Sequence, residues 1–204
     1  MTVWLAMALY SLSMSISPGP VNLLAMTNGL NYGFGRSFSY VSGATIGFIS
    51  LFFLTGLSVS FISELMPNVM KLTGIIGALF VGYIGWQIVK TSEVTHNHDP
   101  KNSATFLEGA LLQWLNPKAW IASIAGMSAF QVENTDTLTV FSSIYFVICY
   151  LSIACWAFLG EKLQSVLNEP SKIHRFNQAM GSALILIAGY LLFRLALEWL
   201  ITTD

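Results

Sequence analysis

The stretch LLQWLNPKAWIAS, residues 111–123, decides the fold together with SMSISPGPVNLLAM, residues 13–26. Both stretches are apolar, and both are interrupted by proline near their middle. A proline inside a helix removes a backbone donor and clashes with the preceding turn, and the residue before it is driven out of helical geometry. Ser17 and Asn116 occupy that preceding position. We therefore expect two helices that are each broken at proline.

The composition indicates that these helices are surrounded by lipid. Charged residues make up 9% of the 204 residues and hydrophobic residues 54%, whereas about 25% charged residues is usual in soluble domains. The 9 basic and 10 acidic residues create no basic field that could hold phosphates. These numbers exclude a soluble enzyme, a disordered chain and a nucleic-acid-binding protein, and they make the lipid bilayer the expected environment.

Six apolar stretches are long enough to cross a bilayer, which takes about 20 residues of helix. They are residues 3–26, 38–62, 69–89, 109–130, 138–159 and 176–201. They do not alternate in polarity as the strands of a membrane barrel do. No Lys or Arg occurs before residue 18, which favours a retained membrane segment over a cleaved signal peptide. The sequence therefore predicts an all-α membrane protein with six transmembrane helices.

A polar linker separates the six stretches into two groups of three. The linker, residues 91–105, lies between a first three-helix repeat at residues 1–90 and a second at residues 106–204. An odd number of spans inverts the second repeat, and broken helices at matching positions of inverted repeats indicate the central site of a transporter. Helices one and four are the broken pair here. The alternative is that the prolines serve helix packing alone. His96 and His98 of the linker fit an exposed loop better than a metal site.

The basic residues between the stretches predict an orientation in the membrane. The loops that follow the first, third and fifth stretches carry Arg36, Lys90, Lys101, Lys162, Lys172 and Arg175. The opposite side carries only Lys71 and Arg194. Cytoplasmic loops are the ones enriched in Lys and Arg. We therefore expect the odd-numbered loops, including the linker, in the cytoplasm and both termini outside.

Lys118 is the charged residue that lies deepest in an apolar stretch. It lies about 13 Å along a straight helix from the start of the fourth stretch, where an ammonium is costly. Carbonyls freed at the breaks could hold it, burial could remove its proton, or an anionic ligand could meet it; alternatively, the break brings water to it. No Asp or Glu lies in mid-span, so Lys118 and Glu108 are the candidates for ion coupling. Asn22 and Trp114 lie beside the breaks and are candidates for the transport path.

Small residues predict where helices approach one another closely. Gly43 and Gly47 are four residues apart on one face of the second stretch, a spacing that allows membrane helices close contact. Ser11 and Ser15 share one face of the first stretch. They either face the transport path or bond back to the preceding turn of their own helix.

Four segments, in order along nearly the whole chain, resemble the LysE/RhtB family of amino-acid exporters. SPGPVNLLAMTNGLNYGFGRSFSYVSGATIGF, residues 17–48, resembles the amino-terminal signature of that family. The other segments are GALFVGYIGWQIVKTS (77–92), LLQWLNPKAW (111–120), which holds the Asn-Pro-Lys-Ala motif, and HRFNQAMGSALILIAGYLL (174–192). Residues 121–130, IASIAGMSAF, depart from the aromatic-rich run that many family members have at this place.

The resemblance implies an exporter of amino acids or close derivatives in the bacterial inner membrane, driven by protons. The motif positions expected to shape its central site are Pro18, Gly19, Pro20, Asn116, Pro117 and Lys118. Under alternating access, the substrate carboxylate would bind near the amino end of a half-helix, with Lys118 adding charge there.

The composition of the spans also bears on functions other than amino-acid export. The alternative is a metal or inorganic-ion permease of the same superfamily, which would group carboxylates, His or Cys within the spans. An intramembrane enzyme is not expected, because no His lies in any span, and neither is a cofactor or bound metal. The sequence leaves open which amino acid and which coupling ion are moved, and whether the protein forms a homo-oligomer.

Overall fold

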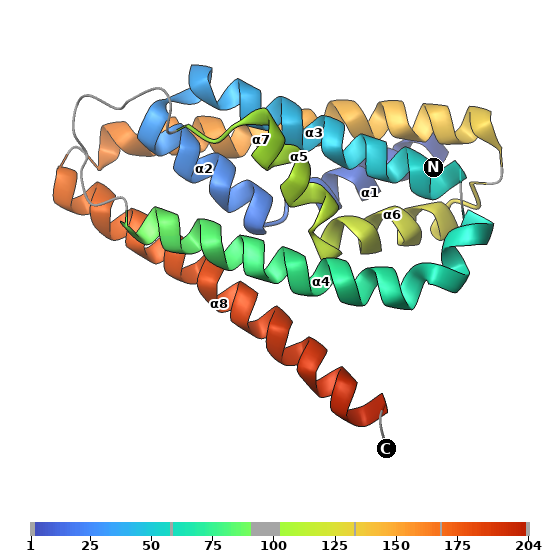
Figure 1. The fold of residues 1–204 in the computed structure, drawn as a ribbon. Coiled ribbons are helices and arrows are strands. Elements are labelled where there is room, and N and C mark those ends of the chain that lie inside the picture. Colours follow the sequence, from blue (N-terminus) through green and yellow to red (C-terminus); the bar gives the residue numbers. More distant parts are fainter. Residues whose placement is uncertain (1–2, 58, 91–102, 133, 168, 203–204) are drawn as a thin grey trace.

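The computed structural model describes residues 3–57, 59–90, 103–132, 134–167 and 169–202. All regular structure within these ranges is α-helical (Figure 1). The helices are α1 (Val3–Ile16), α2 (Pro20–Tyr32), α3 (Phe34–Leu57), α4 (Val59–Lys90), α5 (Phe106–Trp114), α6 (Pro117–Ala129), α7 (Thr135–Val166) and α8 (Pro170–Thr202). The predicted all-α class is thus confirmed for the described residues.

The two predicted breaks lie where one helix ends and the next begins. α1 ends at Ile16 and α2 begins at Pro20, and α5 ends at Trp114 and α6 begins at Pro117. Each proline takes the first position of a new helix, where its missing N–H group costs no hydrogen bond. The prolines therefore start helices here rather than kink them.

The length and hydropathy of the helices support some of the six predicted membrane spans. α3, α7 and residues 170–197 of α8 are each long and apolar enough to cross a membrane. α1 and residues 74–90 of α4 are apolar but shorter. A 14-residue helix such as α1 reaches about 21 Å, less than the ~30 Å hydrocarbon core. The broken helices therefore need both of their parts to cross, and six complete crossings stay a prediction.

Some helix ends differ from the apolar stretches that predicted them. The stretch 38–62 runs past the end of α3 at Leu57, and α8 begins at Pro170, ahead of residue 176. The reason is that backbone hydrogen bonds and caps, rather than hydropathy, set a helix end. Asn134 shows this at the start of α7, where its side chain accepts a hydrogen bond from the Thr137 N–H at 2.8 Å.

The packing of the helices is similar in the two halves of the chain, because in each half the two parts of the broken helix contact one long helix of the other half. α7 contacts α1 and α2, α3 contacts α5 and α6, and α3 and α7 contact each other (Figure 1). α4 pairs with α8, whose carboxyl half extends away from the other helices in Figure 1. Large aromatic side chains fill the core between α3 and α7, among them the fully buried Phe52, Phe141 and Tyr145.

Glycines allow two close helix crossings. At the α3–α5 crossing, a Cβ atom on Gly43 would lie 1.9 Å from the Phe106 carbonyl oxygen, and one on Gly47 would lie 2.6 Å from the Ala110 Cα. At the α2–α7 crossing, a Cβ atom on Gly29 would lie 1.9 Å from the Ala157 carbonyl oxygen. Any side chain at these positions would force the helices apart.

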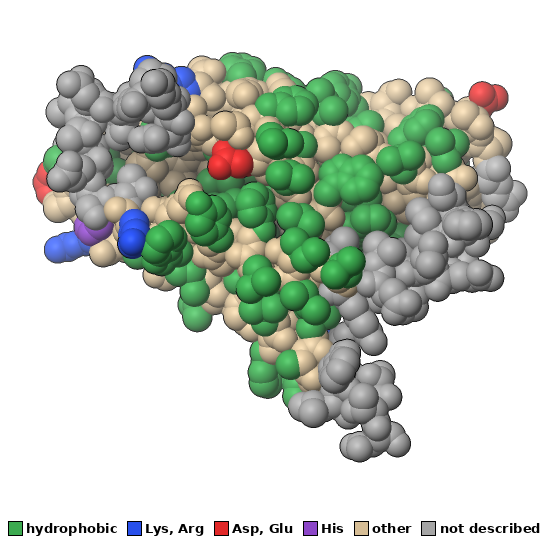
Figure 2. Space-filling model, in the orientation of Figure 1, with side chains coloured by type: hydrophobic (Ala, Val, Ile, Leu, Met, Phe, Trp, Pro, Cys, Tyr) green, Lys and Arg blue, Asp and Glu red, His purple; other side chains and the backbone are tan. Residues whose placement is uncertain are grey.

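Basic residues gather at one end of the molecule. The α2–α3 junction, the end of α4 and the α7–α8 junction meet there, opposite the start of α1 (Figure 1). Described residues of this basic end are Arg36, Lys90, Lys162, Lys172 and Arg175, and Figure 2 shows Lys and Arg side chains gathered over it. Lys101, His96 and His98 lie outside the described residues.

Candidate functional site

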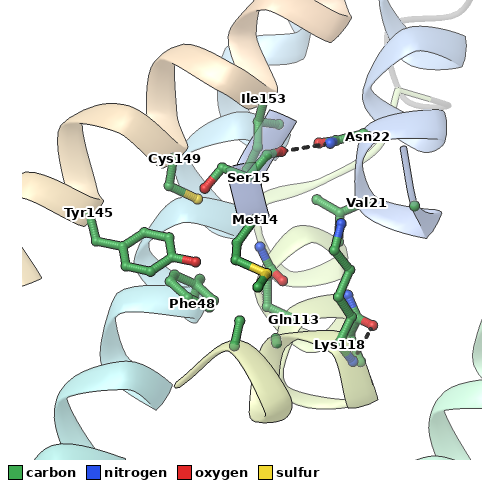
Figure 3. Close-up of a pocket in the computed structure, with 14 residues that line it drawn as sticks. Met14, Ser15, Val21, Asn22, Phe48, Gln113, Lys118, Tyr145, Cys149 and Ile153 are labelled. Carbon is green, nitrogen blue, oxygen red and sulfur yellow. Dashed lines mark hydrogen bonds between the residues drawn. The ribbon is translucent and has the colours of Figure 1, made fainter. Parts of the chain in front are cut away.

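A cavity lies between the two helix breaks (Figure 3). The space between its walls, including the part open to solvent, is about 420 Å³. The ends of α1 and α5 and the starts of α2 and α6 form one part of its wall, and α3 and α7 form the rest. Both interruptions of the chain therefore open on the same space.

At the first break, protein side chains bind the carbonyls that α1 leaves free. The Asn22 Nδ2 atom donates to the Ser15 carbonyl at 2.8 Å and to the Ser17 carbonyl at 2.9 Å. The Trp156 indole N–H, from α7, donates to the Ile16 carbonyl at 3.0 Å. In a membrane such carbonyls must be satisfied within the protein or by a watered cavity. Here the protein itself satisfies them.

At the second break, side chains from both sides complete the backbone. The Asn116 Oδ1 atom caps α6 by accepting from the Lys118 backbone N–H at 3.1 Å. The Trp120 indole N–H donates to the Trp114 carbonyl at 2.7 Å, and the Trp114 indole N–H donates to the Ser50 hydroxyl at 3.2 Å. The two tryptophan rings meet edge to face, 6.2 Å between centroids. These contacts hold α5 and α6 at a fixed angle.

The side chain of Lys118 connects the two breaks. Its Nζ atom donates to the Ser17 hydroxyl at 2.7 Å and to the Ser17 carbonyl at 3.1 Å. The sequence left several alternatives open for Lys118. Among the described residues, the structure shows one of them, in which a freed carbonyl holds the ammonium. No carboxylate forms a salt bridge with Lys118 among the described residues. Its place in the first turn of α6 is electrostatically unfavourable for a cation, because the helix dipole is positive there.

The amino end of α2 also faces the cavity. Gly19 precedes the helix in an extended conformation and provides no side-chain cap, and Pro20 has no N–H group. Val21 and Asn22 follow in the first turn and line the cavity with Gly19. Uncapped N–H groups at a helix start, together with the dipole, attract anions. The α2 amino end and the Lys118 ammonium therefore make one side of the cavity electropositive.

The residues that the sequence singled out divide into two groups. Gly19, Asn22, Asn116 and Lys118 line the cavity. The others shape its surroundings: Pro18, Pro20 and Pro117 at the breaks, Trp114 behind the second break, and Gly43 and Gly47 at the α3–α5 crossing.

Glu108 lies at the start of α5, away from the cavity lining. Its carboxylate accepts hydrogen bonds from the Thr105 N–H at 2.7 Å and from the Thr105 hydroxyl at 2.9 Å, and the Glu108 N–H donates to that hydroxyl at 3.2 Å. This is a capping box, which the sequence signals by a threonine followed three residues later by a glutamate. The structure therefore gives Glu108 a helix-capping contact, and its part in ion coupling stays a prediction.

Other lining residues could not be singled out from the sequence. Tyr145, Cys149 and Ile153 are spaced four residues apart on one face of α7 and line the cavity opposite Lys118 (Figure 3). That spacing places the three residues on one face of a helix, but the sequence does not show that this face meets the cavity. The two serines of α1 differ, because Ser15 lines the cavity whereas Ser11 donates to the Met7 carbonyl at 2.8 Å. Ser11 thus bonds back to the preceding turn of its own helix, and a place for Ser15 in the transport path stays a prediction.

Comparison with known proteins places the chain in a family. The family model of the LysE type translocators matches residues 12–195. The chain belongs to the LysE type translocator family. Family membership makes it a membrane transport protein rather than an enzyme, and the matched segment includes both breaks and every residue that lines the cavity.

Curated relatives of this translocator are efflux proteins. Proteins named cysteine/O-acetylserine efflux protein from Salmonella typhimurium (strain LT2), Escherichia coli (strain K12) and Shigella flexneri serotype 5b are each 24% identical to it. Each match extends over 164 residues, 78% of this chain and 83% of the relative. No solved structure matches the chain.

Proposed function

We propose that this LysE type translocator exports an amino acid or a close derivative through the cavity between its two helix breaks. The observation that carries the proposal is the electropositive side of the cavity, where the Lys118 ammonium and the α2 amino end lie together. Membership of the LysE family and the efflux function named for the relatives support the same substrate class.

The carboxylate of the amino acid would bind between Lys118 and the α2 amino end. An ammonium has three protons, and Ser17 accepts two of the hydrogen bonds of Lys118, which leaves one for a ligand. The N–H groups of the first turn of α2 supply further donors. A carboxylate there would also offset the unfavourable position of the Lys118 charge at the start of α6.

Alternating access around this site is the mechanism that we propose. Residues 1–90 and residues 106–204 would form two inverted three-helix repeats, joined by a cytoplasmic linker at residues 91–105. The reciprocal packing supports this division, because α7 contacts α1 and α2 as α3 contacts α5 and α6. Rocking of one repeat against the other around a fixed site would expose the cavity to each side of the membrane in turn.

Protons are the coupling ion in this proposal, and the protein works in the bacterial inner membrane. Lys118 is favoured over Glu108 as the coupling residue because it lies in the cavity, whereas Glu108 caps α5. The basic end would face the cytoplasm, and both termini would lie outside. No group of three or more potential metal ligands occurs among the described residues, so no observation favours the metal-permease alternative.

Uptake into inverted membrane vesicles tests the proposal, because uptake there corresponds to export from the cell. The vesicle interior is made acidic and labelled cysteine, O-acetylserine, serine, leucine, lysine and glutamate are supplied outside. We expect gradient-dependent uptake of at least one of them, and its loss when a protonophore collapses the gradient. Absence of uptake for every compound would contradict the proposed function.

Lys118→Met tests the proposed role of the ammonium. Loss of a hydrogen bond to a charged group corresponds to a fall in kcat/KM of about ten- to a hundredfold. Lys172→Met is the matched control, because Lys172 is exposed and its ion pair among the described residues is with the exposed Glu169, at 3.0 Å. Equal amounts of each variant in the membrane must be confirmed first. Wild-type kcat/KM in Lys118→Met would show that the ammonium does not bind the substrate.

A further inference from the structure

Gln113 differs from the other polar side chains at the breaks. It lies in the last turn of α5, it is only 6% exposed, and it lines the cavity. The side chains of Asn22, Asn116 and Trp120 all make hydrogen bonds. The Gln113 side-chain amide makes none with any described residue, although an amide can accept through its oxygen and donate twice through its nitrogen.

The Gln113 amide is open to the cavity. Among the described residues, the fully enclosed side-chain polar atoms without a hydrogen-bond partner are the hydroxyl oxygens of Thr45 and Ser142, whereas Gln113 is part of the cavity lining. In the view of Figure 3 the Gln113 side chain lies between Phe48 on one wall and Lys118 on the other. A molecule bound in the cavity would therefore meet this amide directly and satisfy it.

The charge of the residues that line the cavity restricts the charge that the bound molecule can have. Lys118 is the one charged residue among the described residues that line the cavity. The wall opposite it is formed by Phe48, Tyr145 and Cys149, with the Ser15 hydroxyl beside them (Figure 3). A substrate with a cationic side chain would bring a second positive charge into a low-dielectric space that provides no carboxylate to pair with it.

We propose that Gln113 contacts the substrate directly, and that the cavity selects against amino acids whose side chains are positively charged. The Gln113 oxygen accepts from the α-ammonium, and Lys118 binds the α-carboxylate. The substrate side chain then lies against the wall of Phe48, Tyr145 and Cys149. This inference rests on the proposed export function and names its substrate class.

Gln113→Met tests the contact, because methionine keeps the length of the side chain and removes its polar atoms. We expect KM for an exported neutral amino acid to rise about ten- to a hundredfold, with a smaller change in kcat. The thermal unfolding temperature should stay close to that of the wild-type protein, since the Gln113 amide makes no hydrogen bond with any described residue. Gln178→Met is the control, because Gln178 is exposed on α8. A lower unfolding temperature with unchanged KM would mean that Gln113 is structural and would overturn the proposal.

Binding can be measured apart from transport through Cys149, which lines the cavity. In a Cys155→Ser background, a bound substrate should slow alkylation of Cys149 by N-ethylmaleimide, and Gln113→Met should raise the substrate concentration needed for that protection. Protection at the same concentration in both proteins would contradict direct contact.

Gln113→Glu tests the charge selection. It places a carboxylate in the cavity, and we expect the ratio of kcat/KM for lysine to that for serine to rise at least about tenfold. In the wild-type protein, excess unlabelled lysine should not compete with a neutral substrate. Equal competition by lysine there would overturn the selection. No export of any amino acid by the wild-type protein would instead overturn the proposed function, so the two failures are distinguishable.

Discussion

At the first helix break, a single side chain takes the place of two backbone donors. Asn22 donates to the carbonyls of Ser15 and Ser17, which the proline-containing segment leaves without helical partners. The polar residue beside the break was recognisable in the sequence as a candidate for the transport path. Its pairing was not, because hydrogen bonds back to the preceding helix depend on how tightly the chain turns.

Asn22→Leu should destabilise the protein. The Ser15 carbonyl, which is half-buried, would lose its side-chain donor, and leaving such a group unpaired costs about 1–3 kcal/mol. Thermal unfolding in detergent measures the effect as a lower midpoint. Ser13→Ala is the control, because the exposed Ser13 hydroxyl donates to the Leu9 carbonyl of its own helix, and its loss should change stability by less than about 0.5 kcal/mol. Equal midpoints for the two variants would contradict the role given to Asn22.

Among the elements, the crossing of α3 with α5 depends on the absence of side chains. The four-residue spacing of Gly43 and Gly47 predicted a face of close approach, and the structure places both glycines against the α5 backbone. The identity of the partner helix could not be predicted, because a stripe of small residues fits any helix that comes close enough.

Gly43→Ala should therefore weaken the α3–α5 crossing. The added Cβ atom would lie 1.9 Å from the Phe106 carbonyl oxygen, and because backbone has to move, we expect a loss of about 1–3 kcal/mol or more. Gly189→Ala is the matched control within a helix, since nothing lies within 4 Å of its added Cβ atom and alanine favours helix. Thermal unfolding in detergent distinguishes them, and an unchanged midpoint for Gly43→Ala would show that the crossing tolerates a side chain.

In the whole molecule, the unequal distribution of basic residues is the feature that bears on orientation. Arg36, Lys90 and Lys162 come from different parts of the chain, and the fold brings them to the same end as Lys172 and Arg175. The sequence predicted this grouping from loop order alone, because consecutive membrane helices alternate in direction. Which side of the membrane that end faces is part of the proposed function.

Reporter fusions test the orientation. A reporter that is active only in the cytoplasm should be inactive when it is fused after Asp204 and active when it is inserted in the linker after His98. The reason is that the basic end, and the linker with it, should remain on the cytoplasmic side. Activity of the fusion after Asp204 would reverse the proposed orientation.

The sequence by itself determined the helical class, the membrane environment and the position of both helix breaks. It could do so because charge scarcity and the missing N–H group of proline act locally, whatever the rest of the chain does. Only the tertiary structure decided that Lys118 reaches Ser17, 101 residues away, that Cys149 lies on the cavity wall, and that Gln113 faces the cavity unpaired. Those properties depend on the rotation and crossing of helices far apart in the chain, which no local pattern specifies.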